Sequence, residues 1–193
     1  MHTGRVETDN AAAEFFALVK DTGRSAIRKN YPLVLLVGAL AVLVGGVLSL
    51  GILFGPLMLG YTRVCLRMAR DEAVDFRDVV SGFDRFGASF FATLLLAIAM
   101  AIGSLLVVGG VVVAFFATFT FHAMAENDDQ GAVDGVKRSI ALVKENLLDV
   151  ALFWALSLIV GGVLGYVLVG GPIALALASL LSAFLYRRLD EKS

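Results

Sequence analysis

Three arginines are spaced so that they share one face of a helix. Arg63, Arg67 and Arg70 stand at positions i, i+4 and i+7, which lie above one another on an α-helix. Guanidinium groups bind phosphate well, and charge inside a membrane often marks a functional site. The stripe therefore predicts a contact with an anionic lipid headgroup or substrate. We favour a structural interpretation, in which the side chains reach to the membrane surface or pair with the acidic residues of 71–75.

A second polar stripe is formed by Thr118, His122 and Glu126, at i, i+4 and i+8. A proton relay through a membrane needs side chains of this kind in such a row. Glu126 stands at the border of an apolar run and His122 one turn inside it. We therefore favour an ordinary polar edge at the membrane surface over a relay.

Signatures of catalysis and of cofactor binding are absent. Cys65 and two histidines, His2 and His122, cannot build a metal site. No glycine loop precedes Lys-Ser/Thr, and no Gly-x-Ser-x-Gly motif occurs. We expect neither an enzyme nor a cofactor. Sixteen basic and 17 acidic residues leave a net charge of −1, which argues against nucleic-acid binding.

The elements that hold these residues follow from the distribution of charge. Asn30–Thr62, Phe86–Ala125 and Val150–Tyr186 contain no Asp, Glu, Lys or Arg and are 33, 40 and 37 residues long. One membrane span needs about 20 apolar residues, so each run suits two spans. Glycines near the middle of each run allow the chain to turn back. The sequence predicts three helical hairpins.

This pattern predicts an all-α, polytopic transmembrane bundle. The expected spans are about 31–50, 53–70, 86–107, 110–126, 147–168 and 172–188. Residues 1–30 form an N-terminal cytoplasmic segment, 31–188 the membrane domain and 189–193 a cytoplasmic tail. A β-barrel would show alternating polarity. A soluble bundle would need polar helix faces, and Leu94–Val113 has almost none.

The basic residues set the predicted orientation. Both termini and both charged loops must lie on one side, because the number of spans is even in each hairpin. These segments carry Arg24, Arg28, Lys29, Arg85, Lys137, Arg138, Lys144, Arg187 and Arg188, besides the arginine stripe. The positive-inside rule places that side in the cytoplasm. We expect a multi-pass protein of the cytoplasmic (inner) membrane, with the lipid bilayer as its surroundings.

The first and third hairpins resemble each other. A shift of 116 residues aligns Asn30 with Asn146, Gly45-Gly46 with Gly161-Gly162, and Gly55-Pro56 with Gly171-Pro172. Thirteen of the 31 residues from 30 to 60 are identical under this shift. The pattern predicts an internal parallel repeat, which occurs in transporters. Duplication of a stable hairpin without a transport role is the explanation that we favour.

Short polar segments are expected to form interfacial helices at about 9–20, 76–83 and 132–145. In the last of them an apolar stripe steps by three and four: Val133, Val136, Ile140, Val143 and Leu147. Such helices lie in the membrane surface or, alternatively, dock a protein partner. Ala174, Ala178 and Ser182 form a small-residue stripe that predicts close helix packing. Trp154 is expected to be a packing residue too.

The chain resembles a broad group of prokaryotic six-span membrane proteins, which is related to the membrane domain of some glycerophosphodiester phosphodiesterases. The residues that carry the resemblance are Gly55-Pro56-Leu57, Gly60, Tyr61, Gly82-Phe83, Ser139, Lys144, Asn146, Pro172 and Tyr186. It covers about residues 20–189. It implies a fold and no catalytic residues. The chain has no phosphodiesterase domain, so that activity is not expected.

Three functions stay open on these grounds. The first is a structural or accessory membrane component without enzymatic activity. The second is a small transporter or permease subunit that uses the repeat and the arginine stripe. The third is a lipid-binding membrane module. A polar cavity at the middle of the bilayer would favour transport, and a solid apolar core would exclude it.

Overall fold

The computed structural model contains helices and no strands in the part of the chain that it describes. That part comprises residues 17–20, 22, 31–49, 51–104, 109–127, 129, 131–164 and 170–191. The prediction of an all-α fold is confirmed for these residues. Of the N-terminal helix expected at 9–20, residues 17–20 belong to this part and are helical, and the others lie outside it.

The first hairpin consists of α2 (Tyr31–Leu48) and α3 (Phe54–Ala69). Gly51 has a φ of 88° in the turn between them, a conformation that glycine adopts without steric cost. The Ser49 hydroxyl accepts a hydrogen bond from the Leu53 N–H (3.0 Å) and so ties the turn together. Both helices begin within one residue of the predicted positions.

The 3₁₀ helix η1 (Phe76–Arg85) follows and lies directly on α3. A Cβ atom on Gly60 of α3 would lie 2.0 Å from the Val79 carbonyl oxygen. One on Gly82 of η1 would lie 2.1 Å from the Pro56 carbonyl oxygen. The two backbones are therefore in contact, and glycine is required on both sides.

The second hairpin departs from the prediction. α4 (Phe86–Ser104) is continuous, but the span expected at 110–126 consists of two helices, α5 (Gly109–Phe116) and α6 (Thr120–Glu126). A turn at residues 117–119 separates them. The predicted span is nevertheless apolar enough to cross a membrane as Gly109–Glu126, and a serine from another helix, described below, contacts the backbone at the turn that interrupts it.

Three further helices complete the described chain: α7 (Ala132–Glu145), α8 (Leu147–Leu164) and α9 (Gly170–Asp190). α8 begins at the predicted residue and α9 two residues before it. The turns expected near 107–110 and 168–172 lie largely outside the described residues.

The helix α7, which was expected to be interfacial, buries a different face from the predicted one. Its buried residues are Ala132, Gly135, Ser139, Leu142 and Val143, so of the expected stripe only Val143 is buried. A Cβ atom on Gly135 would lie 2.7 Å from Met124 Cγ, which shows how closely α7 approaches α6. Small residues allow this approach, while the larger Val133 and Leu147 stay exposed.

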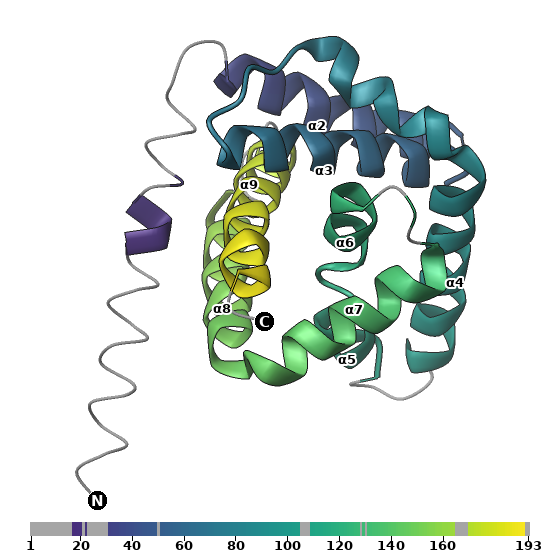
Figure 1. Cartoon of the computed structure of the whole chain (residues 1–193), viewed down its shortest axis with the longest axis vertical. Helices are drawn as coiled ribbons and strands as arrows, with labels where there is room; N and C mark the ends of the chain where they lie inside the picture. The colour runs from purple at the N-terminus through teal and green to yellow at the C-terminus, as the bar shows by residue number, and fades with distance from the viewer. Residues whose placement is uncertain are drawn as a thin grey trace, which may run out of the picture.

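The helices enclose a central element (Figure 1). In that view α2 and α3 run across one end, α4 runs along one side, the pair α8 and α9 along the other, and α7 crosses the remaining end. α6 lies between them. α3 contacts α2, η1, α4, α6 and α9, and most of its residues are buried. α3 is therefore the hub of the core.

Among the described residues, four stretches of helix are long and apolar enough to cross a membrane: Tyr31–Leu48, Phe76–Gly103, Gly109–Glu126 and Gly171–Asp190, with η1 joined to α4 and α5 to α6. Leu147–Gly162 is shorter and also apolar. Large apolar side chains point outward, such as Val47 (76% exposed) and Leu158 (68%). An exposed apolar surface of this kind suits contact with lipid.

Candidate functional site

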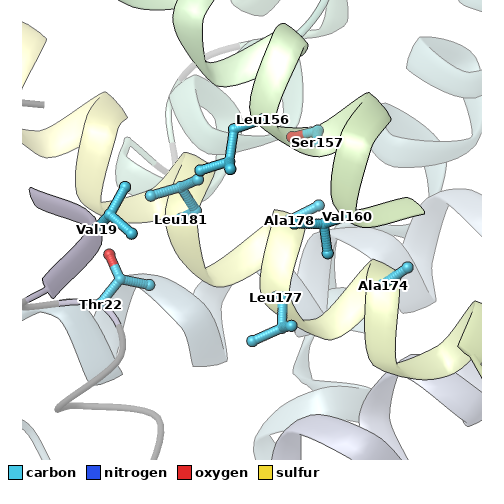
Figure 2. Close-up of a pocket in the computed structure, with 9 residues that line it drawn as sticks. All are labelled: Val19, Thr22, Leu156, Ser157, Val160, Ala174, Leu177, Ala178 and Leu181. Atoms are coloured by element: carbon cyan, nitrogen blue, oxygen red, sulfur yellow. The ribbon is translucent and has the colours of Figure 1, made fainter. Parts of the chain in front are cut away.

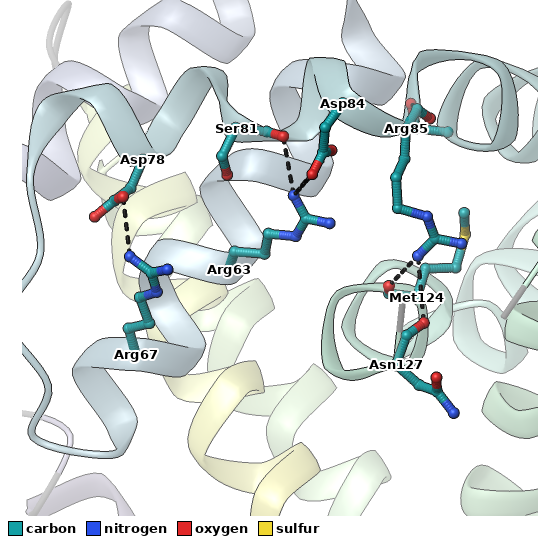
Figure 3. A network of polar contacts seen from close by, with 9 residues as sticks. Arg63, Arg67, Asp78, Ser81, Asp84, Arg85, Met124 and Asn127 are labelled. Atoms are coloured by element: carbon teal, nitrogen blue, oxygen red, sulfur yellow. Dashed lines mark hydrogen bonds and ion pairs between the residues drawn. The ribbon is translucent and has the colours of Figure 1, made fainter. Parts of the chain in front are cut away.

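Arg63, the deepest residue of the arginine stripe, is held by η1 (Figure 3). Its Nη1 donates to Asp84 Oδ2 at 2.9 Å and to the Ser81 carbonyl oxygen at 2.9 Å. The Arg63 side chain is 14% exposed and that of Asp84 is 57% exposed. The guanidinium therefore joins the middle of α3 to the end of η1.

The other two arginines of the stripe are paired in the same way. Arg67 contacts Asp78 of η1 at 2.9 Å (Figure 3), and Arg70 pairs with Glu126 at the end of α6. The spacing correctly placed the three side chains on one face of α3. Their carboxylate partners favour the structural interpretation of the stripe over an open anion site.

Further arginines bind the ends of neighbouring helices. Arg85 Nη1 donates to the carbonyl oxygens of Met124 (2.8 Å) and Asn127 (3.2 Å) at the end of α6 (Figure 3). Arg187 donates to the Ala69 carbonyl oxygen at the end of α3. The last carbonyl groups of a helix lack internal partners and carry partial negative charge, so a cation there is favourable.

α7 is joined to the end of α9 by Arg138, whose Nη2 lies 2.6 Å from Asp190 Oδ1. This hydrogen bond raises the pKa of the guanidinium above its ordinary value. We call the six paired arginines the arginine rim: Arg63, Arg67, Arg70, Arg85, Arg138 and Arg187. The rim connects α3, η1, α6, α7 and α9, and it fastens the ends of these helices to one another.

The second predicted stripe does not form one chain of hydrogen bonds. Thr118 lies in the turn between α5 and α6 and accepts from Trp154 Nε1 of α8 at 2.9 Å. His122 Nε2 lies 3.0 Å from Ser182 Oγ of α9. Glu126 pairs with the third arginine of the first stripe. The three side chains thus face three different helices, an arrangement that favours packing over proton transfer along the stripe.

Ser139 of α7 occupies the break between α5 and α6. Its hydroxyl accepts from the Phe119 N–H at 3.0 Å and donates to the Phe116 carbonyl oxygen at 2.7 Å. Ser139 and Phe119 are fully buried. A break inside apolar surroundings is tolerated when neighbouring side chains satisfy the freed backbone groups. Ser139 therefore replaces the missing helical hydrogen bonds.

The hydrogen bonds around His122 allow its tautomer to be assigned. We assign the ring proton to Nε2, because the Ser182 hydroxyl donates to the Ser179 carbonyl oxygen at 2.9 Å and then accepts from His122. Phe119 and Tyr186 flank the ring, with centroid distances of 6.0 and 5.6 Å. Nδ1 is then an unprotonated acceptor, buried and without a hydrogen-bond partner among the described residues.

Four buried side-chain atoms in the described part of the chain lack a hydrogen-bond partner: Thr62 Oγ1, Thr120 Oγ1, His122 Nδ1 and Ser157 Oγ. Such atoms are rare in folded proteins and point to an ordered water or a ligand. Within the same residues, no group of three His, Cys, Asp or Glu side chains could hold a metal ion.

An apolar groove of about 400 Å³ lies between α4, α5 and α7. Its walls are Leu95, Leu96, Ala99, Val112, Val113, Phe116, Ala117, Val136 and Ile140, and Lys144 is the one charged residue that lines it. Lys144 is exposed and has no ion pair among the described residues. It differs in this respect from the arginine rim.

Comparison with known proteins places the chain in one family. No curated protein and no solved structure matches it. A family model described as a domain of unknown function, DUF7847, matches residues 17–186, which include every helix from α2 to α8 and nearly all of α9. The chain therefore belongs to the DUF7847 family.

Proposed function

We propose that this protein is an integral component of the cytoplasmic membrane that binds an anionic membrane lipid and has no catalytic centre. The observation that carries the proposal is the groove between α4, α5 and α7. Its apolar walls suit an acyl chain, and Lys144 at its edge suits a phosphate headgroup. The arginine rim is less suited to this role, because its guanidinium groups already pair within the protein.

The proposed topology has six crossings, with both termini in the cytoplasm. The arginine rim supports it, because contacts within the rim bring together the ends of α3, α6 and α9 that would face the cytoplasm. α3, with 16 residues, is about 24 Å long, shorter than the hydrocarbon layer of about 30 Å. It would cross as a central helix shielded by its neighbours.

Helix bounds also support the proposed internal repeat. Under the shift of 116 residues, the described residues of α2 (31–48) fall on the described residues of α8 (147–164), and Phe54, the first residue of α3, falls on Gly170 of α9. The two hairpins differ in their surroundings, since α3 contacts α2, η1, α4, α6 and α9, whereas its counterpart α9 contacts mainly α2, α3 and α8. This asymmetry favours duplication of a hairpin followed by divergence.

Reporter fusions test the topology. A fluorescent protein fused after residue 193 should be fluorescent, because it folds in the cytoplasm. Alkaline phosphatase at the same place should be inactive, whereas phosphatase inserted after residue 106 should be active. An active phosphatase at the C-terminus would refute the proposed orientation.

Native mass spectrometry in mixed-lipid nanodiscs tests the lipid site. We expect retention of anionic over zwitterionic phospholipid, and Lys144→Ala should weaken it about fivefold, which corresponds to about 1 kcal/mol per basic residue near an anionic headgroup. Ala99→Leu should fill the groove and reduce retention of both lipids. Lys137→Ala is the matched control, because Lys137 lies on the same helix and is 74% exposed beside Asp134. Equal losses in the Lys144 and Lys137 variants would refute the site.

A transporter or permease subunit is the second candidate function. The break at residues 117–119, next to the buried His122, favours it, because interrupted helices with nearby polar groups form substrate sites in transporters. Proton uptake by proteoliposomes is the test. Uptake that depends on His122 and not on Lys144 would favour transport over lipid binding.

A further inference from the structure

A second cavity, of about 200 Å³, lies between α8, α9 and the N-terminal residues Val19 and Thr22 (Figure 2). Val19 and Thr22 form one wall, Leu156, Ser157 and Val160 of α8 another, and α9 the third. It shares no lining residue with the groove beside Lys144. The inference below is therefore independent of the proposed lipid site, and it rests on the proposed topology.

The cavity exists because two small residues of α9 face it. Ala174 and Ala178 were expected to bring helices into close contact, and they line this cavity instead. The third residue of that stripe, Ser182, is buried against His122. For comparison, an apolar cavity of about 150 Å³ is large enough to stay dry and bind benzene. The space in this protein is sufficient for a small apolar molecule.

One polar atom in the wall requires a partner. Ser157 Oγ is buried and makes no hydrogen bond with the described residues. The Thr22 hydroxyl donates to the Leu18 carbonyl oxygen at 2.8 Å, so its proton is already used. Ser157 can therefore donate one hydrogen bond to a ligand that brings an acceptor.

The depth of Ser157 narrows the chemistry of that ligand. Ser157 lies ten residues after the start of α8 at Leu147, about 15 Å along the helix and near the middle of a 30 Å hydrocarbon layer. Phospholipid tails have no hydrogen-bond acceptor at that depth. We infer that the cavity binds a lipophilic carbonyl compound, whose hydrocarbon part contacts the apolar walls and whose oxygen accepts from Ser157.

Tryptophan fluorescence provides the test, because Trp154 is the one tryptophan of the chain and lies one turn before Ser157. The purified protein in zwitterionic nanodiscs is titrated with an ω-bromoalkyl methyl ketone and with the bromoalkane of equal length. Bromine quenches indole fluorescence at short range. We expect saturable quenching in which the ketone binds about fivefold more tightly, the ratio that corresponds to one net hydrogen bond.

Variants separate the cavity from partition into the bilayer. Ser157→Ala should remove the preference for the ketone and keep quenching by both probes. Ala178→Leu should fill the cavity and abolish saturable quenching. Ala155→Leu, on the exposed face of α8, is the control and should behave like the wild type. Thermal unfolding of each variant establishes that it is folded.

Two results would overturn the inference. One is equal quenching of the wild type by ketone and bromoalkane. The other is unchanged saturable quenching in folded Ala178→Leu. If Ala178→Leu does not fold, the comparison of Ser157→Ala with the wild type tests the inference alone. Loss of one hydroxyl hardly changes the packing volume, so an unchanged preference for the ketone in Ser157→Ala would then overturn the inference.

Discussion

Replacement of Gly60 by alanine tests the contact between α3 and η1 most directly. The new Cβ atom would lie 2.0 Å from the Val79 carbonyl oxygen, whereas real Cβ contacts are essentially never shorter than 3.0 Å. Both partners belong to helix backbones, so no side chain can rotate away. The helices must separate by about 1 Å, which also disturbs the ion pair of Arg63 with Asp84.

The expected loss of stability follows from two opposing effects. Overpacking of this kind costs about 3 kcal/mol, the upper part of the usual range. Alanine has the higher helix propensity, and in place of glycine within a helix it stabilises the folded protein by about 1 kcal/mol. The net loss of about 2 kcal/mol lowers the melting temperature by roughly 4–8 °C for a chain of this size.

The assay is thermal unfolding of the purified protein in nanodiscs, followed by the fluorescence of Trp154. Gly161→Ala is the matched control, because a Cβ atom there would meet no atom within 4 Å, and it should be neutral or slightly stabilising. Gly82→Ala, on the η1 side of the same contact, should lower the melting temperature by a similar amount. A melting temperature of Gly60→Ala within about 2 °C of the wild type, or an equal loss in Gly161→Ala, would refute the reasoning.

Three more outcomes are expected. Ser139→Ala leaves the Phe119 N–H without an acceptor and should cost about 1–3 kcal/mol in thermal unfolding; an unchanged melting curve would contradict its role in the helix break. In a double-mutant cycle, Arg63→Gln and Asp84→Asn should show a coupling energy of at most about 1 kcal/mol, because Asp84 is largely exposed, and no coupling would mean that the pair is not formed. Cys65 is fully buried, so a polar maleimide should label it after denaturation and not before; rapid labelling of the folded protein would disprove this burial.

The positions of the helices could be predicted from the sequence where they depend on local composition alone. Charge-free runs gave the positions of α2, α3, α8 and α9, because length and apolarity alone determine which segments prefer lipid or core. The spacing of Arg63, Arg67 and Arg70 gave their common face, since that depends on helix geometry. Their partners Asp84 and Asp78 could not be predicted, because they depend on how η1 folds back onto α3.

The break between α5 and α6 shows why the remaining features of the fold could not be predicted from the sequence. Residues 114–120 contain neither glycine nor proline, so no local signal marks the turn. It depends on Ser139, which is 20 residues away from Phe119. The phase of α7 was missed for a related reason: its buried face joins the small residues Ala132, Gly135 and Ser139 to Leu142 and Val143, and the close approach of α6 selects it.

The contact of Arg187 with the Ala69 carbonyl oxygen has a consequence for biosynthesis. The two residues are 118 positions apart, and chains are made and begin to fold from the N-terminus. α3, the hub of the fold, therefore leaves the ribosome long before the group that completes its end. We expect truncated chains that lack α9 to expose the end of α3, and such exposure would offer membrane proteases a means to recognise unfinished molecules.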